Sequence, residues 1–265
     1  MNIISSTHNP KIKHLLQLQQ KSSLRREEGH FVVEEQREMQ HCIEAGLQIE
    51  TIFCCDGVNT PPVLADETFI VSPTVYERIA YRGTTEGVIA IVKSHTLTLN
   101  DLKLNENPLI VVLERVEKPG NLGAILRSAD AAGADAVIVC DPLTDLYNPN
   151  LIRSSIGAIF SVPCVACSSS ECIKFLQSHG ISILTAQLQD SNLYYDTDMR
   201  HATAIVMGTE STGLTTQWRT VADNHIRIPM LGRLDSLNVS VSAAILLFEA
   251  VRQRQSSRHD TSKLI

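Results

Sequence analysis

The sequence lacks long hydrophobic runs, and its first residues do not have the pattern of a secretory leader. Its longest unbroken apolar run, residues 243–248, has six residues, whereas a membrane-spanning helix needs about 18 or more. The first residues, MNIISSTHNPKIKHLL, lack the charged, apolar and small-residue sections of a signal peptide. Because neither membrane insertion nor secretion is indicated, we expect a cytoplasmic protein, or one whose targeting segment is not present.

The chain also has too few basic residues for a uniformly basic surface. It contains 23 Lys and Arg against 29 Asp and Glu, a net charge of −6, which excludes nucleic-acid binding through overall charge. Basic residues nevertheless gather at both ends. They are Lys11, Lys13, Lys21, Arg25 and Arg26 within residues 1–30, and Arg252, Arg254, Arg258 and Lys263 within residues 249–265. These two clusters fit either phosphate contacts or a solvated helix surface.

The seven cysteines form neither a disulfide framework nor a complete metal-binding pattern. Without a signal peptide, they are expected to be reduced thiols. Cys164 and Cys167 have redox-like or zinc-like spacing, but no second pair follows, and the apolar residues around them favour a buried strand. The nine histidines show no ligand spacing. The sequence therefore predicts no metal site.

Strand and helix patterns alternate along the chain and predict an α/β fold with a parallel sheet covered by helices. The first part has strand patterns at 31–33, 51–55 and 88–92 and a helix pattern at 34–45. The later strand patterns are 109–113, 136–140, 162–166, 181–186, 202–207 and 225–228, with helix patterns at 121–132, 149–156, 171–179 and 239–253. We expect a small domain at 1–95, a linker at 96–107 and a larger domain at 108–265.

Ligands of parallel α/β sheets bind beyond the carboxyl ends of the strands. The chain lacks both G-x-G-x-x-G and G-x-x-x-x-G-K-[ST], so a standard dinucleotide site or P-loop is not indicated. The unusual segments follow the strands that end at Leu113, Met207 and Ile228. These three loops are the candidate site.

The first loop leads through Pro119-Gly120 into a helix, with Asn121 as the expected N-cap and Gly133 after its end. On that helix Arg127 has small neighbours, which would allow a ligand or another backbone to come close. An arginine on a helix is also commonly just solvated. The residues alone leave both interpretations open.

The residues of the other two loops also fit ordinary local roles, such as turns and helix caps. In the second, Gly208 and Gly213 flank Glu210, a pattern that suits either a ligand or a plain turn. In the third, Asn238 is expected to cap the last helix, whose free N–H groups would favour an anion. Capping alone explains Asn238, but it does not explain the run Ser236-Leu237-Asn238 that follows a strand ending at Ile228-Pro229-Met230.

Together the three segments resemble the SpoU (TrmH) family of RNA ribose 2′-O-methyltransferases in the SPOUT superfamily. The family motifs N-x-G-x-[IL]-x-R, G-x-E-x-x-G-[LI] and I-P-M-x-G-x-x-x-S-L-N-V-[SA] are met at residues 121–127, 208–214 and 228–240. The first ninety residues resemble the family's RNA substrate-binding domain, which has an L30e-like α/β fold. The resemblance implies a C-terminal SPOUT domain with a trefoil knot, a rare topology.

The resemblance also implies S-adenosyl-L-methionine as the cofactor and assigns site residues. Gly208, Ile228, Met230 and Leu237 would hold the cofactor, and Arg127 would serve the reacting ribose. Arginine is a poor base because its pKa is about 12.5 or more, so we expect Arg127 to bind the RNA phosphate and stabilise developing negative charge. Asn121, Ser236 and Asn238 would orient the ribose and Arg127, and Glu210 would fix Arg127 or the loop.

The implied partners are RNA, with rRNA preferred over tRNA, and a second copy of the chain. Val241, Ala244, Ile245, Phe248 and Val251 recur at helical spacing on the last helix. This stripe would be buried either on the chain's own sheet or across a homodimer interface. A catalytically silent RNA-binding or assembly factor of the same fold is the alternative to an enzyme, and a protein that binds another nucleotide is a third hypothesis.

Overall fold

The computed structural model describes residues 3–59, 63–81, 86–209 and 211–261, with side chains up to residue 256. The chain forms two compact units, one of residues 1–96 and 145–161 and the other of residues 97–144 and 162–265. The division expected from the sequence keeps each domain contiguous. In the structure, residues 145–161 pack with the first unit, and Leu99, Leu102 and Leu104 lie against the core of the second.

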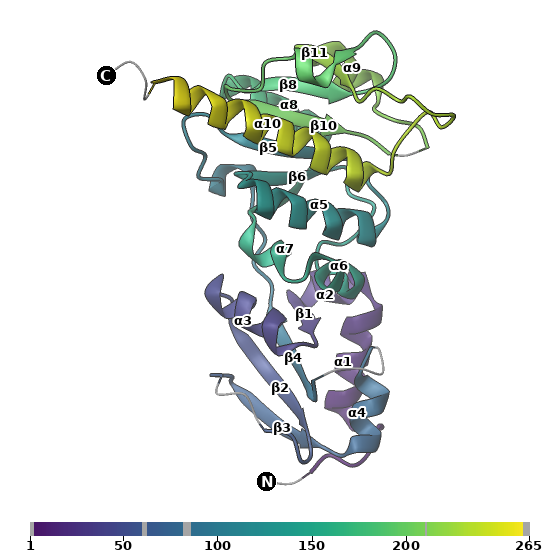
Figure 1. The fold of residues 1–265 in the computed structure, drawn as a ribbon. Helices are drawn as coiled ribbons and strands as arrows, with labels where there is room; N and C mark the ends of the chain where they lie inside the picture. The colour runs from purple at the N-terminus through teal and green to yellow at the C-terminus, as the bar shows by residue number, and fades with distance from the viewer. Residues whose placement is uncertain (1–2, 60–62, 82–85, 210, 262–265) are drawn as a thin grey trace. The chain divides into compact units, whose positions relative to one another are not determined.

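The first unit contains a four-stranded mixed sheet (Figure 1). Its strands are β1 (His30–Val33), β2 (Ile49–Cys55), β3 (Glu67–Val71) and β4 (Val88–Lys93), in the order β1-β4-β2-β3. β4 is antiparallel to β1 and β2, and β3 is parallel to β2. Helices α1 (Pro10–Gln20) and α4 (Pro73–Ile79) cover one face, and α3 (Gln36–Glu44) packs on the other. α2 (Ser22–Glu28) lies beside α1 and β1.

The sequence patterns did not indicate β3 and α4. β3 is an edge strand with one buried residue, Val71, so it carries little hydrophobic signal. α4 has two turns, but its start is marked: Ser72 accepts a hydrogen bond from the Val75 amide, and Pro73 occupies the first turn. This combination of a serine cap and a proline is a helix-start signal that sequence inspection can use.

Residues 145–161 are held in the first unit by one buried ion pair and by aromatic stacking. Arg25 Nε lies 2.6 Å from Asp145 Oδ2, and both side chains are almost fully buried. Arg25 Nη1 also donates to the carbonyl oxygens of Leu18 and Gln19. Phe31 stacks on Tyr147, with ring centroids 4.4 Å apart. The segment forms helices α6 (Pro149–Ser155) and α7 (Ala158–Ser161), which contact β1 and α3 respectively.

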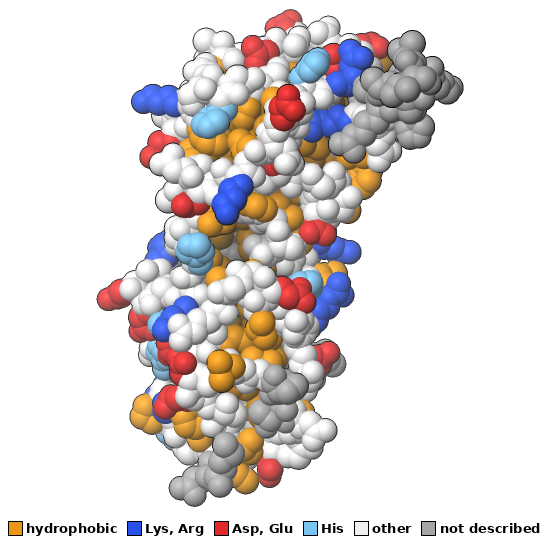
Figure 2. All heavy atoms as spheres, turned by 90° about the vertical axis from the view of Figure 1, so that its left-hand side faces the viewer, with side chains coloured by type: hydrophobic (Ala, Val, Ile, Leu, Met, Phe, Trp, Pro, Cys, Tyr) orange, Lys and Arg blue, Asp and Glu red, His pale blue; other side chains and the backbone are white. Residues whose placement is uncertain are grey.

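The prediction that the basic residues near the N-terminus lie on the surface is therefore wrong for Arg25, which is a core residue. Lys11 is exposed but pairs with Glu67 at 2.5 Å. At the other end, Arg254 is partly buried and donates to four backbone carbonyls, while Arg252 pairs with Glu249. In Figure 2 basic side chains are interspersed with acidic ones on the face shown. Side chains of Arg258 and Lys263 lie outside the described residues.

The second unit contains a seven-stranded parallel sheet in the order β7-β6-β5-β10-β8-β11-β9 (Figure 1). The strands are β5 (Leu109–Glu114), β6 (Ala136–Cys140), β7 (Cys164–Cys167), β8 (Ser182–Ala186), β9 (Asn192–Leu193), β10 (Thr203–Met207) and β11 (Asn224–Arg227). Every residue of β5, β6 and β10 is buried, as expected for strands covered on both faces. The predicted parallel α/β architecture is confirmed.

Four helices cover the two faces of this sheet. α5 (Pro119–Ala132) and α10 (Val239–Thr261) pack together on one face, and α8 (Ser169–Ser178) and α9 (Thr216–Val221) pack on the other. α5 begins at Pro119 with Lys118 as its N-cap, so the prediction of Asn121 as the cap is wrong. Proline is favoured in a first helical turn, which starts the helix two residues earlier and places Asn121 inside it. Gly133 ends α5 with φ 63°, as predicted.

The apolar residues of the last helix, α10, lie on two sides of it, one buried and one exposed. Ala243, Leu246, Leu247 and Ala250 are buried against the rest of the unit. Val241 and Phe248, from the stripe identified in the sequence, are 47% and 48% exposed. The chain's own sheet therefore does not bury that stripe. No helix within the described residues combines the length and apolar character required to cross a bilayer.

Replacing Arg25 by Met should lower the free energy of unfolding of the first unit by about 3–5 kcal/mol, because Asp145 would stay buried without its partner. Hydrogen–deuterium exchange in increasing urea, read on the amides of β1 and α6, measures this unit separately. The exposed neighbour Arg26 gives the control, because Arg26→Ala should change the free energy of unfolding by less than about 0.5 kcal/mol. Equal exchange in the two variants would contradict the stabilising role of the pair.

Two buried carboxyl groups make the first unit sensitive to pH. Burial raises the pKa of Glu34 and of Glu38 to about 7 each. Glu34 accepts hydrogen bonds from Gln19 Nε2 and the Tyr81 amide, and Glu38 accepts one from the Glu34 amide. Arg153 lowers both pKa values and Glu35 raises them. For both groups the pKa in the folded state exceeds the ordinary value of 4.5. Their contribution to folding stability is therefore fully present below about pH 4.5 and is lost as the pH rises through 7.

The Glu38→Gln variant should therefore unfold at a higher temperature than the wild type at pH 8 and at nearly the same temperature at pH 4.5. The amide removes the cost of burying a charge and can still accept the hydrogen bond from the Glu34 amide. Thermal unfolding of the first unit across this pH range measures the difference. Exposed Glu27 supplies the control, since Glu27→Gln should leave the pH dependence unchanged. If the unfolding temperature of Glu38→Gln changed with pH in parallel with that of the wild type, the raised pKa of Glu38 would be refuted.

Candidate functional site

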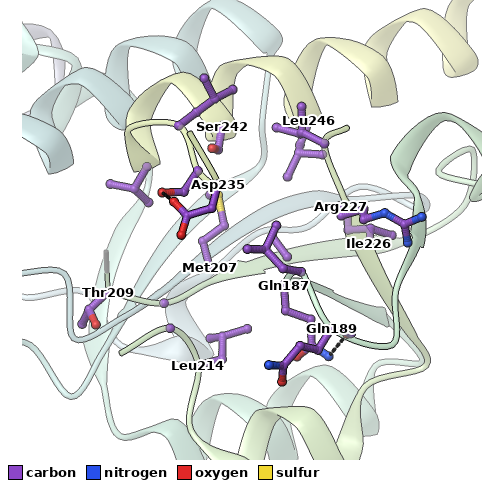
Figure 3. A pocket seen from close by; sticks show the side chains of 18 of the residues that line it. Gln187, Gln189, Met207, Thr209, Leu214, Ile226, Arg227, Asp235, Ser242 and Leu246 are labelled. Carbon is purple, nitrogen blue, oxygen red and sulfur yellow. Dashed lines mark hydrogen bonds between the residues drawn. The ribbon is translucent and has the colours of Figure 1, made fainter. Parts of the chain in front are cut away.

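A cavity of about 710 Å³ lies at the carboxyl ends of β8, β10 and β11 in the second unit. Figure 3 shows side chains from several segments surrounding it. Its walls come from residues 186–189 at the end of β8, 207–209 and 211–214 at the end of β10, 226–228 and 230 at the end of β11, and 235–239, 242 and 246 at the start of α10 and just before it. Two of the three loops singled out in the sequence therefore meet here, as expected for the carboxyl edge of a parallel sheet.

The loop after β10 folds tightly on itself. The Gly213 amide donates to the Thr209 carbonyl at 3.0 Å, and Thr209 and Gly213 form an isolated bridge. A Cβ atom on Gly208 would collide with the Gly213 carbonyl and the Leu214 nitrogen. Glycine is thus required at 208 by the close approach of two backbone segments, and the loop presents backbone to the cavity.

A buried carboxylate fixes the end of this loop to the sheet. Glu114, the last residue of β5, is 2% exposed and accepts hydrogen bonds from the Thr215 amide at 2.8 Å and the Thr215 hydroxyl at 2.7 Å. Ser169 donates to Asp141 at 2.6 Å and accepts from the Trp218 indole at 3.2 Å. Sequence inspection missed Glu114, although a carboxylate that ends a fully apolar strand was a visible signal.

The loop before α10 contributes residues of the third motif. Asn238 Oδ1 accepts from the Ser240 amide at 2.9 Å, so Asn238 caps α10 as predicted. Its Nδ2 donates to Asn121 Oδ1 at 3.2 Å. The first and third motifs are therefore joined by a side-chain hydrogen bond between residues 117 positions apart in the sequence.

The structure places most of the residues predicted for the site around the cavity. Gly208, Ile228, Met230, Ser236, Leu237 and Asn238 line it. Asn121 lines a smaller cavity of about 150 Å³ that shares Gly208, Thr209 and Ser211 with the larger one. Arg127 is exposed on α5 and lines neither cavity. Glu210 lies outside the described residues.

The cavity combines apolar walls with a few polar side chains. Three of these, Gln187, Arg219 and Arg227, were not predicted from the sequence. Met207, Leu214 and Leu246 are part of the wall, as are the charged residues Arg219, Arg227 and Asp235. Gln187 Nε2 donates to the Gln189 carbonyl at 2.9 Å, whereas Gln187 Oε1 is buried with no partner among the described residues. An unpartnered buried acceptor in a cavity wall fits a ligand that carries a hydrogen-bond donor. Gln187, Arg219 and Arg227 stand outside the three motifs, so only the folded chain indicated them.

Comparison with known proteins adds relatives with named activities. The chain is 37% identical over 182 residues to a 23S rRNA (uridine(2479)-2′-O)-methyltransferase from Streptomyces viridochromogenes, which covers 66% of this chain and 63% of the relative. The chain thus spans less than two thirds of that relative's length. A crystal structure of an RNA 2′-O ribose methyltransferase shares 39% identity and a TM-score of 0.84, covering 96% of this chain and all of the other. An AdoMet-bound rRNA methyltransferase from Sinorhizobium meliloti shares 28% identity and a TM-score of 0.86, covering 95% and 97%.

Two family descriptions match the two parts of the chain. Residues 9–90 match the MRM3-like substrate binding domain. Residues 108–248, more than half of the chain, match the SpoU rRNA Methylase family. The resemblance inferred from the three motifs is confirmed, and this chain belongs to the SpoU rRNA methylase family.

Proposed function

We propose that the protein transfers the methyl group of S-adenosyl-L-methionine to a ribose 2′-oxygen of RNA, and that this RNA is ribosomal. The main support is the meeting of the second and third motif loops around one cavity, with Asn121 of the first motif bonded to Asn238. The Streptomyces relative is named for 23S rRNA, which favours rRNA over tRNA. Such a substrate would be met in the cytoplasm.

The cavity suits a nucleoside cofactor that also carries a charged tail. Its volume falls within the range of about 300–1,000 Å³ common for small-molecule sites. Backbone at Gly208, Ile228 and Leu237 would hold the adenosine, and Met230 would form part of the wall. The buried acceptor Gln187 Oε1 would receive a hydrogen bond from a donor of the ligand. S-adenosyl-L-methionine supplies an electrophilic methyl group when bound.

Arg127 acts on the RNA side of the reaction in this proposal. It is exposed and has no ion-pair partner among the described residues, so its guanidinium is available to a phosphate. A ribose 2′-hydroxyl is a poor nucleophile until its proton is removed, and a fixed positive charge stabilises the alkoxide as it develops. Asn121, Ser236 and Asn238 orient the ribose, and Glu210 fixes Arg127 or the loop.

The exposed side of α10 supports a homodimer through the second unit. Val241 and Phe248 are about half exposed, and helix faces of this kind are buried when a second copy packs on them. A two-fold axis would make the interface self-complementary. We place Arg127 of one subunit near the cofactor of the other, and the trefoil knot implied by the family at the loops that line the cavity.

Two substitutions should separate RNA chemistry from cofactor binding. Arg127→Ala should lower kcat about 100- to 1,000-fold, the usual effect of losing one charge-stabilising donor, while leaving AdoMet affinity unchanged. Leu237→Arg should abolish AdoMet binding, because its charge would enter the cavity beside Arg219 and Arg227. Methyl transfer to rRNA and calorimetry with AdoMet measure the two effects.

Leu234 provides a matched control for the cofactor side. It lies three residues from Leu237, is 75% exposed and does not line the cavity, so Leu234→Arg should bind AdoMet like the wild type. Unchanged affinity in Leu237→Arg would mean that the cofactor lies elsewhere. Normal turnover in Arg127→Ala would remove Arg127 from the reaction, and an RNA-binding wild type without transferase activity would favour a silent assembly factor.

Mixed dimers test whether a site is shared between subunits. An equal mixture of Arg127→Ala and Leu237→Arg chains should recover about a quarter of the wild-type activity, because half of the dimers are mixed and each mixed dimer has one site without either lesion. Subunit exchange followed by a methyl-transfer assay measures this recovery. Mixed dimers that form but remain inactive would show that each site is built within one chain.

A further inference from the structure

Three cysteines that are distant in the sequence meet at the carboxyl edge of the second unit's sheet. Cys140 ends β6, Cys167 ends β7 and is its register partner, and Cys172 lies on α8. Their three Sγ atoms all lie within 4.8 Å of one another. All seven cysteines of the chain are free thiols, so no disulfide occupies the cluster.

Sequence spacing pointed to a different pair. Cys164 and Cys167 are three residues apart on one strand, and side chains of a strand alternate between the two faces of the sheet, so these two point to opposite sides. Cys167 and Cys140 lie on the α8 side, where Cys172 completes the group. The expectation of no metal site relied on that spacing and therefore did not consider this cluster.

The cluster lies near the N-terminal end of a helix and is partly accessible. Cys172 is in the first turns of α8, a ten-residue helix whose N-terminus is capped by Ser168 and Glu171. The positive end of a helix dipole stabilises thiolates. Cys167 is also the one member of the three that solvent reaches, since Cys140 and Cys172 are buried.

We propose that Cys140, Cys167 and Cys172 bind one thiophilic d¹⁰ metal ion, with Zn²⁺ as the physiological representative of that class. A zinc ion lies about 2.3 Å from each sulfur, which places tetrahedral ligands about 3.8 Å apart. The three Sγ atoms all lie within 4.8 Å of one another, so each pair is at most about 1 Å farther apart than this spacing. A water molecule at the accessible side, next to Cys167, would complete the coordination.

The ion would act as a structural crosslink. It would join the ends of β6 and β7 to α8, whose first residue, Ser169, bonds to Asp141 and to Trp218 of α9. Metal binding requires loss of thiol protons and contributes its free energy to the folded state. Zinc should therefore raise the thermal midpoint of the second unit and should do so more strongly as the pH rises.

The test uses the full chain, reduced and stripped of metal with a chelator. Cd²⁺ serves as the spectroscopic probe and Zn²⁺ as the competitor. We expect a thiolate-to-cadmium charge-transfer band that saturates at one ion per chain and disappears when Zn²⁺ is added. Zn²⁺ should raise the thermal midpoint and protect Cys167 from alkylation, as mapped by peptide mass spectrometry. Absence of the charge-transfer band at equimolar Cd²⁺ would overturn the proposal.

Serine variants locate the site. Cys167→Ser should lower Zn²⁺ affinity by at least about 100-fold and abolish the rise in thermal midpoint. Cys164→Ser, on the same strand but outside the cluster, and Cys55→Ser, in the first unit, should bind Zn²⁺ like the wild type. Wild-type affinity in Cys167→Ser would overturn the proposal. If that variant fails to fold, the alkylation pattern of the wild type with and without Zn²⁺ decides, since unprotected Cys167 would refute the site.

Discussion

The buried carboxylate of Glu114 holds one loop of the candidate site to the sheet. It ends a strand whose other residues are all apolar and buried, so its oxygens need hydrogen-bond donors, which the amide and hydroxyl of Thr215 supply. These bonds hold Thr215, which directly follows the cavity residues Gly213 and Leu214, at the carboxyl edge of the sheet. A buried charge without such partners would cost several kcal/mol. The cavity wall at Leu214 is therefore joined to the sheet next to it by one hydrogen-bonded carboxylate.

The parallel sheet explains why the three motifs meet although they span more than 100 residues. Parallel strands direct all their carboxyl ends to the same edge, and β5, β10 and β11 bring the motif segments that follow them to this edge. α10 buries one of its faces on the unit that it completes, and it leaves Val241 and Phe248 exposed. The same helix thus closes the fold, starts at the cavity through Asn238 and offers a surface to a second chain.

Hydrophobic runs predicted the central strands well, because β5, β6 and β10 are buried on both faces and contain almost only apolar residues. The edge strand β3 was missed because a strand with one covered face and few neighbours needs few apolar residues. Asn121 was placed as a helix cap because asparagine is common there. Pro119 begins the helix earlier, and Asn121 instead bonds to Asn238, a contact that local propensity cannot indicate.

The sequence by itself determined the α/β class, the family and the loops of the candidate site, because these depend on local patterns and on motifs with fixed spacing. Tertiary structure decided which charged and sulfur-containing side chains are available. Arg25 belongs to an apparent basic cluster but is buried against Asp145, 120 residues away, and Cys140 meets Cys167 and Cys172 across two strands and a helix. Such contacts depend on how the chain returns to itself, and short-range sequence patterns carry no information about that path.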